Sequence, residues 1–172
     1  MNQSSKHLIV YGSLLHPDQL RKHGIALERV THVTFKGWRR VFNQEPSWRP
    51  ADSPYRAVMN IQEDVDSWFN ALLIRDLTPE HIRELDHRER GYSRVALPNG
   101  AVTTYEGEVI IDCIVYVGKA EKRNDKIYPN RDYFSLCREG AHAHFEAFYR
   151  DYLTTTYAFD GQEIRPITEG SL

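Results

Sequence analysis

Apolar residues follow two different periods along this chain, and the shorter one predicts strands. Residues 8–10 form an uninterrupted apolar run, which is typical of a strand buried on both faces. Short runs rich in β-branched and aromatic residues recur further along and predict more strands. They lie at 30–35 and 38–42, turning around Gly37, and then at 56–62, 68–74, 92–97 and 108–117. Asp112 is expected at a solvent edge or against a partner.

Helical periodicity predicts two shorter helices before the middle of the chain. Residues 17–23 form a short predicted helix that Gly24 ends. A second helix begins after Thr78, a good N-cap residue, and Gly91 is its stop signal.

The longest helical pattern lies late in the chain. From Arg131 to Tyr152 apolar residues recur every three or four positions, which predicts one long amphipathic helix with Asn130 as its cap. Gly140 lies in its middle and costs about 1 kcal/mol relative to alanine. We therefore expect a close approach of backbone or ligand at Gly140.

No linker or internal repeat divides the 172 residues, so we expect a single domain over 1–172 with a polar tail at 160–172. Residues 43–54 are rich in Pro, Ser and Trp and predict a surface loop. Trp48 in this loop is either a rim aromatic packed on the fold or a lid over a pocket. Many short strands with few helices predict an α+β fold.

Composition excludes several classes of protein. Twenty-two basic and 24 acidic residues give a formal charge of −2, which favours neither a nucleic-acid nor a membrane partner. The basic cluster 36–40 is interpreted as a solvated face. No long apolar stretch or signal-peptide pattern is present, so a cytoplasmic protein is expected. Cys113 and Cys137 are expected to be buried thiols.

A short motif follows the first predicted strand. Tyr11, Gly12, Ser13 and Leu14 form a turn at the mouth of that strand. Such a turn can aim successive backbone N–H groups at one point, which suits a carboxylate or an oxyanion. This segment is a candidate anion site.

A second motif, Leu85–Tyr92, supplies a candidate acid or base. Ile82, Leu85 and Glu89 fall at i, i+3 and i+7 of the predicted helix, so Glu89 is expected to point inward. Burial raises the pKa of a carboxyl group and suits it to proton transfer near neutral pH. Glu84 is expected on the other, solvated side.

A structural interpretation of the same helix stays open. Glu89 is then a boundary residue held by a nearby arginine, and Asp86 and Arg90 form an ordinary pair four residues apart.

Taken together, these motifs resemble those of the γ-glutamylcyclotransferase-like superfamily. A third segment, Pro129-Asn130-Arg131-Asp132-Tyr133, is similar to the Pro-Ser-x-x-Tyr stretch that opens the late helix in that family. The resemblance spans roughly residues 7 to 150. Leu14 stands where one branch has Asn, and Asn130 stands where Ser is common, and both departures bear on the substrate.

The resemblance implies a small mixed β-barrel flanked by helices and an enzyme that cyclises a γ-glutamyl group to 5-oxoproline without metal or cofactor. Its partner is a small γ-glutamyl molecule, and the oligomeric state is left open. It makes Glu89 the catalytic residue. The residues implied to bind substrate are Tyr11, Gly12, Ser13, Leu14, Tyr92 and Tyr133. The alternatives are a non-catalytic module that binds a γ-glutamyl or amino-acid ligand, and a structural domain.

Other candidate chemistry finds little support. His142 and His144 are two residues apart on a helix and project in nearly opposite directions, so they do not form a chelating pair. His16 and His87 flank the two motifs but are more typical of surface positions. Ser13 is not in a nucleophile elbow, and no glycine-rich nucleotide loop is present.

Overall fold

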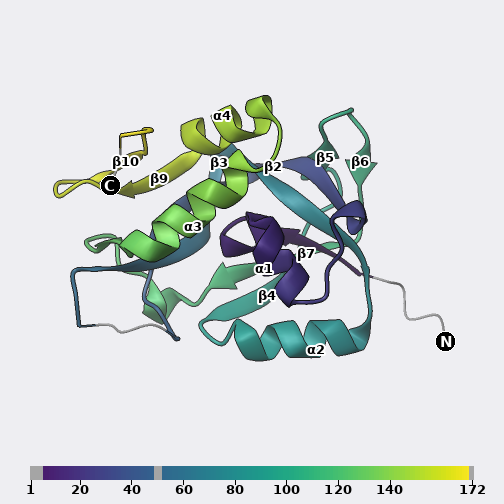
Figure 1. Cartoon of the computed structure of the whole chain (residues 1–172), viewed down its shortest axis with the longest axis horizontal. Helices are drawn as coiled ribbons and strands as arrows, with labels where there is room; N and C mark the ends of the chain where they lie inside the picture. Colours follow the sequence, from purple (N-terminus) through teal and green to yellow (C-terminus); the bar gives the residue numbers. More distant parts are fainter. Residues whose placement is uncertain (1–5, 49–51, 171–172) are drawn as a thin grey trace.

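A computed structural model describes residues 6–48 and 52–170, in which a mixed sheet is packed against four α-helices (Figure 1). The strands are β1 (Lys6–Val10), β2 (Val30–Gln44), β3 (Tyr55–Leu77), β4 (Tyr92–Ala96), β5 (Val102–Thr104), β6 (Val109–Ile110), β7 (Cys113–Gly118), β8 (Tyr128–Pro129), β9 (Thr156–Phe159) and β10 (Ile164–Pro166). The helices are α1 (Pro17–Lys22), α2 (Pro79–Arg88), α3 (Arg131–His142) and α4 (Glu146–Thr154), with short 3-10 turns η1 (Ser13–Leu15), η2 (Leu27–Arg29) and η3 (Ala120–Lys122).

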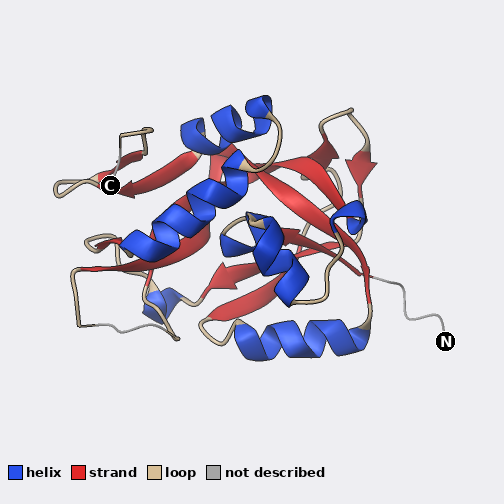
Figure 2. Cartoon of the chain, in the orientation of Figure 1, coloured by secondary structure: helices blue, strands red, loops and turns tan. Residues whose placement is uncertain are grey.

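The sheet is strongly curled and forms half of a barrel (Figure 2). Its hydrogen-bonded order is β10-β9-β2-β3-β1-β7-β4, with β5 beside β2, β6 beside β5 and β8 beside β3. Both parallel and antiparallel pairs occur, because β1 pairs with β7, and β2 with β9, in the parallel sense. Within the described residues β10 and β4 do not pair, so the predicted mixed barrel flanked by helices is confirmed as a half-barrel. In Figure 1, α1 lies between α2 and α3.

The long strands β2 and β3 pair antiparallel along most of their length. Two separate strands were predicted in place of each, and this prediction is wrong. Gly37 has a φ of 88° and lies where the pairing register shifts, so it forms a bulge and β2 continues beyond it. The predicted loop 43–54 begins only after Gln44, and residues 49–51 lie outside the described residues.

Two further predictions for the strands need correction. The predicted strand 108–117 is divided into β6 and β7 at Asp112, which is exposed and has a left-handed φ of 58°. The predicted polar tail 160–172 contains β10, which pairs with β9, and Ile167 beyond it is buried. The polar composition of residues 160–172 therefore gave no indication of the hairpin that β9 and β10 form at the edge of the sheet. Residues 171–172 lie outside the described residues.

The predicted long helix is divided into α3 and α4. Asn130 caps α3 as predicted, because its side chain accepts a hydrogen bond from the N–H of Tyr133 at 2.9 Å. The chain turns at Ala143–Phe145, where His144 Nε2 bonds the carbonyl of Leu15 at 2.8 Å. Apolar spacing of three and four continues through this turn, so the periodicity could not reveal the break.

The predicted close approach at Gly140 is confirmed. A Cβ built on Gly140 would lie 2.6 Å from the backbone nitrogen of His16 and 2.8 Å from its Cα. Glycine thus allows α3 to rest directly on the backbone between η1 and α1.

The core holds one charged group that the sequence placed in solvent. Arg40, assigned above to a solvated face, is fully buried. Its guanidinium donates to the carbonyl of Asn70 at 2.6 Å and to Thr156 Oγ1 at 2.9 Å, and it lies 4.5 Å from the ring centre of Tyr152. Cys113 and Cys137 are buried thiols, as predicted.

We expect Gly140→Ala to destabilise the protein by about 1–3 kcal/mol, because the added methyl group would clash with the backbone of His16, which can move only at a cost in free energy. Chemical denaturation measures this change in the free energy of unfolding. Glu139→Ala, an exposed substitution on the same helix, should change it by less than about 0.5 kcal/mol. Equal stabilities for the two variants would contradict the close packing.

Candidate functional site

Glu89 lies at the C-terminal end of α2. Thr78 caps the start of the helix by accepting from the N–H of His81 at 3.2 Å, and Leu85 is buried on the face toward the core. The N–H of Glu89 donates to the carbonyl of Leu85 at 2.8 Å, so Glu89 closes the last turn. Its side chain is 21% exposed. The predicted inward orientation of Glu89 is confirmed.

The cradle loop, which we define as residues 11–14, connects β1 to α1 through η1. Gly12 packs closely in it, because a Cβ at this position would lie 2.8 Å from the hydroxyl of Tyr133. Among the described residues, no hydrogen-bond acceptor is found for the backbone N–H groups of Gly12, Ser13 and Leu14. These N–H groups are therefore available as hydrogen-bond donors, and the predicted anion-binding role of the loop stays a prediction.

Two adjoining cavities bring the cradle loop and Glu89 together. The outer pocket has a volume of about 660 Å³, and the inner pocket is a small recess of about 50 Å³. The inner pocket is lined by the whole cradle loop and by Glu89. Both pockets share the residues Ser13, Leu85, Arg88, Glu89, Tyr92 and Tyr133. Glu89 thus stands where the two pockets meet.

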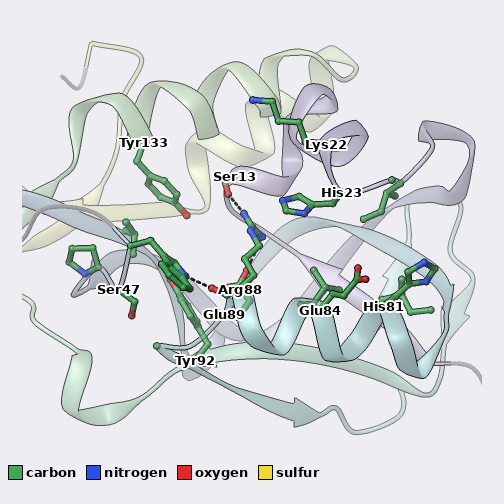
Figure 3. A pocket seen from close by; sticks show the side chains of 18 of the residues that line it. Ser13, Lys22, His23, Ser47, His81, Glu84, Arg88, Glu89, Tyr92 and Tyr133 are labelled. Atoms are coloured by element: carbon green, nitrogen blue, oxygen red, sulfur yellow. Dashed lines mark hydrogen bonds and ion pairs between the residues drawn. The ribbon is translucent and has the colours of Figure 1, made fainter.

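Three tyrosines surround this junction. The hydroxyl of Tyr92 donates to the carbonyl of Met59, and that of Tyr11 to the carbonyl of Tyr116, each at 2.5 Å. Tyr133 points into the pocket (Figure 3), whereas Phe134 and Cys137 on the same helix are buried in the core. Burial raises the pKa of all three tyrosines well above the ordinary value, so they stay protonated at neutral pH.

Arg88 connects the two motifs directly. Its guanidinium donates to Glu89 Oε1 at 2.9 Å and to Ser13 Oγ at 3.1 Å (Figure 3). The pKa of Glu89 is raised, mainly because burial disfavours the carboxylate, and the positive charge of Arg88 opposes that rise. The sequence analysis mentioned a nearby arginine only as a structural partner and gave Arg88 no place in the pocket.

Most residues that line the outer pocket were not predicted from the sequence. Lys22 and His23 at the end of α1, and His81 on α2, line it together with Glu84. Glu84 is exposed, as expected, but it faces this pocket (Figure 3). Each of these charged residues stands alone in the sequence near a helix end, so no sequence motif indicated that the fold would bring them together in one pocket. The predicted site residues, by contrast, all line one of the two pockets.

Trp48 forms part of the wall of the outer pocket. Its Nε1 donates to the carbonyl of Arg88 at 2.5 Å, and the guanidinium of Arg90 lies 3.6 Å from its ring centre. Asp86 pairs with Arg94 at 2.7 Å, so the suggested pair with Arg90 does not form. Trp48 is therefore anchored at the rim while still 55% exposed.

The neighbouring histidines have structural roles. His16 Nδ1 accepts from the N–H of Asp18 and caps α1. His87 lies beside the ring of Trp48, and His142 and His144 pack on different partners. In the part of the chain that the structure describes, no group of three or more metal-ligating side chains is found. Nor is any described helix long and apolar enough to cross a membrane.

Comparisons with known proteins identify the fold. No protein-family model matches the chain, and no curated protein sequence matches it. Among solved structures, a γ-glutamyl cyclotransferase has a TM-score of 0.65 at 15% identity, over 96% of this chain and 95% of that one. A glutathione-specific γ-glutamyl cyclotransferase from yeast has a TM-score of 0.58 at 13% identity, over 88% and 97%.

YkqA from Bacillus subtilis has a TM-score of 0.67 at 17% identity, over 86% of this chain and 52% of YkqA. The chain thus spans about half the length of YkqA. Likenesses at such identities show the fold. The chain has the γ-glutamylcyclotransferase-like fold, which confirms the resemblance inferred from the three motifs.

The electrostatics of Glu89 predict how its replacement affects stability. Because its pKa is raised in the folded state, the free energy of unfolding falls as the pH rises through that raised value, and the carboxylate costs stability at neutral pH. Glu89→Gln should therefore melt at the same temperature as the wild type at pH 7.5, or higher. Thermal denaturation at pH 5 and pH 7.5 measures this, and a markedly earlier melt at pH 7.5 would assign Glu89 to structural ion pairing with Arg88.

Proposed function

We propose that this protein is a γ-glutamylcyclotransferase-like enzyme in which Glu89 moves protons. The observation that carries the proposal is the meeting of a partly buried carboxylate with unbonded backbone N–H groups in one small pocket. Solved structures with this fold include proteins named γ-glutamyl cyclotransferases, which supports the same class of reaction for this chain.

In the proposed reaction the substrate carries its own nucleophile. Its α-amine nitrogen attacks its γ-carbonyl carbon and forms the ring C–N bond, and the bond from that carbon to the leaving nitrogen breaks. The products are 5-oxoproline and a free amine or amino acid. Much of the advantage of proximity is built into the substrate, so the protein has to select the folded conformer and move protons. The atoms balance without a metal or redox cofactor.

The α-ammonium nitrogen loses two protons on becoming the ring amide. Glu89 takes the first before the attack and gives it to the leaving nitrogen as the C–N bond breaks. Glu89 then takes the second from the ring nitrogen and passes it to the departing amine, which leaves as an ammonium group. A raised pKa suits both steps, because the carboxylate is then a stronger base and the carboxylic acid forms at a higher pH. The backbone N–H groups of the cradle loop would stabilise the oxyanion that develops on the γ-carbonyl oxygen. Such donors are commonly worth about 3 kcal/mol each in the transition state.

The two pockets meet at Glu89, where the reacting γ-carbonyl and α-amine would lie. The outer pocket of about 660 Å³ leaves room for the departing amine. The runner-up function is a binding module that holds a γ-glutamyl or amino-acid ligand in this pocket without turnover.

Glu89→Gln keeps the size of the side chain but removes the proton acceptor. Turnover should fall by about 10²-fold or more while folding changes little. The assay is 5-oxoproline release from glutathione, γ-glutamylalanine and Nε-(γ-glutamyl)lysine by the purified protein.

The matched control is Glu80→Gln, an exposed substitution on the same helix, which should keep wild-type turnover. A Glu89→Gln variant that keeps its specific activity would refute the catalytic role. Ligand binding without turnover by the wild type would favour the binding module.

The pH dependence of kcat/KM gives a further test. Because the reaction needs the ionised form of Glu89, activity should be lost as the pH falls through its raised pKa, at a pH above the ordinary glutamate value of 4.5. Initial rates between pH 4.5 and 8.5 measure this limb, after a check that the protein stays folded. Full activity at pH 4.5 would show that another group is the base.

A further inference from the structure

The side chain of Arg88 occupies the boundary between the two pockets. It is 27% exposed, Glu89 beside it is 21% exposed, and their charged atoms are 2.9 Å apart. The same guanidinium reaches the cradle loop through Ser13 Oγ at 3.1 Å. Arg88 is therefore held between the carboxylate and the loop, in contact with whatever ligand enters the inner pocket.

The charges of the inner pocket come from this pair. Among the described residues that line it, Arg88 is the basic side chain and Glu89 the carboxylic one, and the rest are apolar, glycine, serine or tyrosine. The α-amino-acid head of a γ-glutamyl compound has a carboxylate and an ammonium group on one carbon. A neighbouring cation and anion on the protein are complementary to that zwitterion.

We propose that Arg88 binds the α-carboxylate of the substrate and thereby places the α-ammonium group beside Glu89. This assignment rests on the proposed function and goes beyond it by naming the recognition element for the α-carboxylate. A substrate must then be a γ-glutamyl compound whose α-carboxylate is free, and the backbone N–H groups of the cradle loop are left for the γ-carbonyl oxygen.

The geometry of the guanidinium allows this second contact. A guanidinium has five N–H groups in a planar fork that fits a carboxylate. Within the described residues Arg88 donates to two acceptors, Ser13 and Glu89. The remaining N–H groups can donate hydrogen bonds to the substrate carboxylate while Arg88 stays beside Glu89.

The test crosses a change in the protein with a change in the substrate. The variants are Arg88→Gln, which removes the charge, Arg88→Lys, which keeps the charge without the fork, and Arg83→Gln as control. Arg83 is exposed on the same helix and lines neither pocket. The substrates are the compound of the panel above that the wild type turns over fastest and its α-carboxamide, with release of the leaving amine as the readout.

The wild type and Arg83→Gln should prefer the carboxylate over the carboxamide by about 10- to 100-fold in kcat/KM. In Arg88→Gln this preference should fall to within a few-fold of one, mainly through a higher KM for the carboxylate. Arg88→Lys should be intermediate. Any effect of Arg88 on Glu89 itself changes both substrates alike and cancels in the ratio.

Titration calorimetry with 5-oxoproline and 5-oxoprolinamide gives a readout without turnover, in which binding of the acid should be lost in Arg88→Gln. An Arg88→Gln variant that keeps the wild-type preference overturns the assignment but leaves the proposed function standing. Equal binding of acid and amide by the wild type overturns it as well. Arg88-dependent binding of 5-oxoproline by a wild type that turns over no panel compound would refute the proposed function alone.

Discussion

The architecture depends on the hydrogen bonds that the protein supplies to one buried cation, the guanidinium of Arg40. Arg40 lies in the core, where burial lowers its pKa to about 10, so it still carries its charge at neutral pH. Removing such a group from water costs several kcal/mol unless the protein replaces the lost hydrogen bonds. Asn70 on β3, Thr156 on β9 and the carbonyl of Tyr152 on α4 supply them. Since these partners come from separate elements, the elements must assemble together.

The same cluster extends toward the site. Arg40 lies 3.5 Å from the carbonyl of Tyr11, and Asn70 also donates to the carbonyl of Phe148 at 2.7 Å, which connects α4 to the start of the cradle loop. The pair of Arg88 and Glu89 differs from it, because each member is about a quarter exposed and has partners to exchange. One ionic group therefore fixes the scaffold, while the other pair remains available for chemistry.

The sequence predicted the elements better than it predicted their limits. Capping residues such as Thr78 and Asn130 identified helix starts, because a cap acts through neighbours a few positions away. The division of the late helix and the continuity of β2 and β3 depend on contacts between distant segments, which local periodicity does not contain. The burial of Arg40 likewise depends on distant residues. Arg40 shares one face of β2 with Trp38 and Phe42, but its hydrogen-bond acceptors lie up to 116 positions away in the sequence.

The site shows the same contrast. The cradle loop and Glu89 could be found because short motifs carry them. Arg88, although adjacent to Glu89, belongs to the pocket because the fold brings the end of α2 next to Ser13, and the sequence contains no local signal of that contact.

The two pockets are built from different parts of the molecule. The inner one is lined by β1 and the cradle loop, by the end of α2, and by single residues of β3, β4, β7 and α3. In the outer wall, Pro46, Ser47 and Trp48 follow β2 as irregular backbone. Ser47 and Trp48 are exposed, so substitutions at these two positions leave the packed core intact. Under the proposed function, a lineage with this design can alter the leaving groups that it accepts at these rim positions while the residues around Glu89 stay under the constraint of folding.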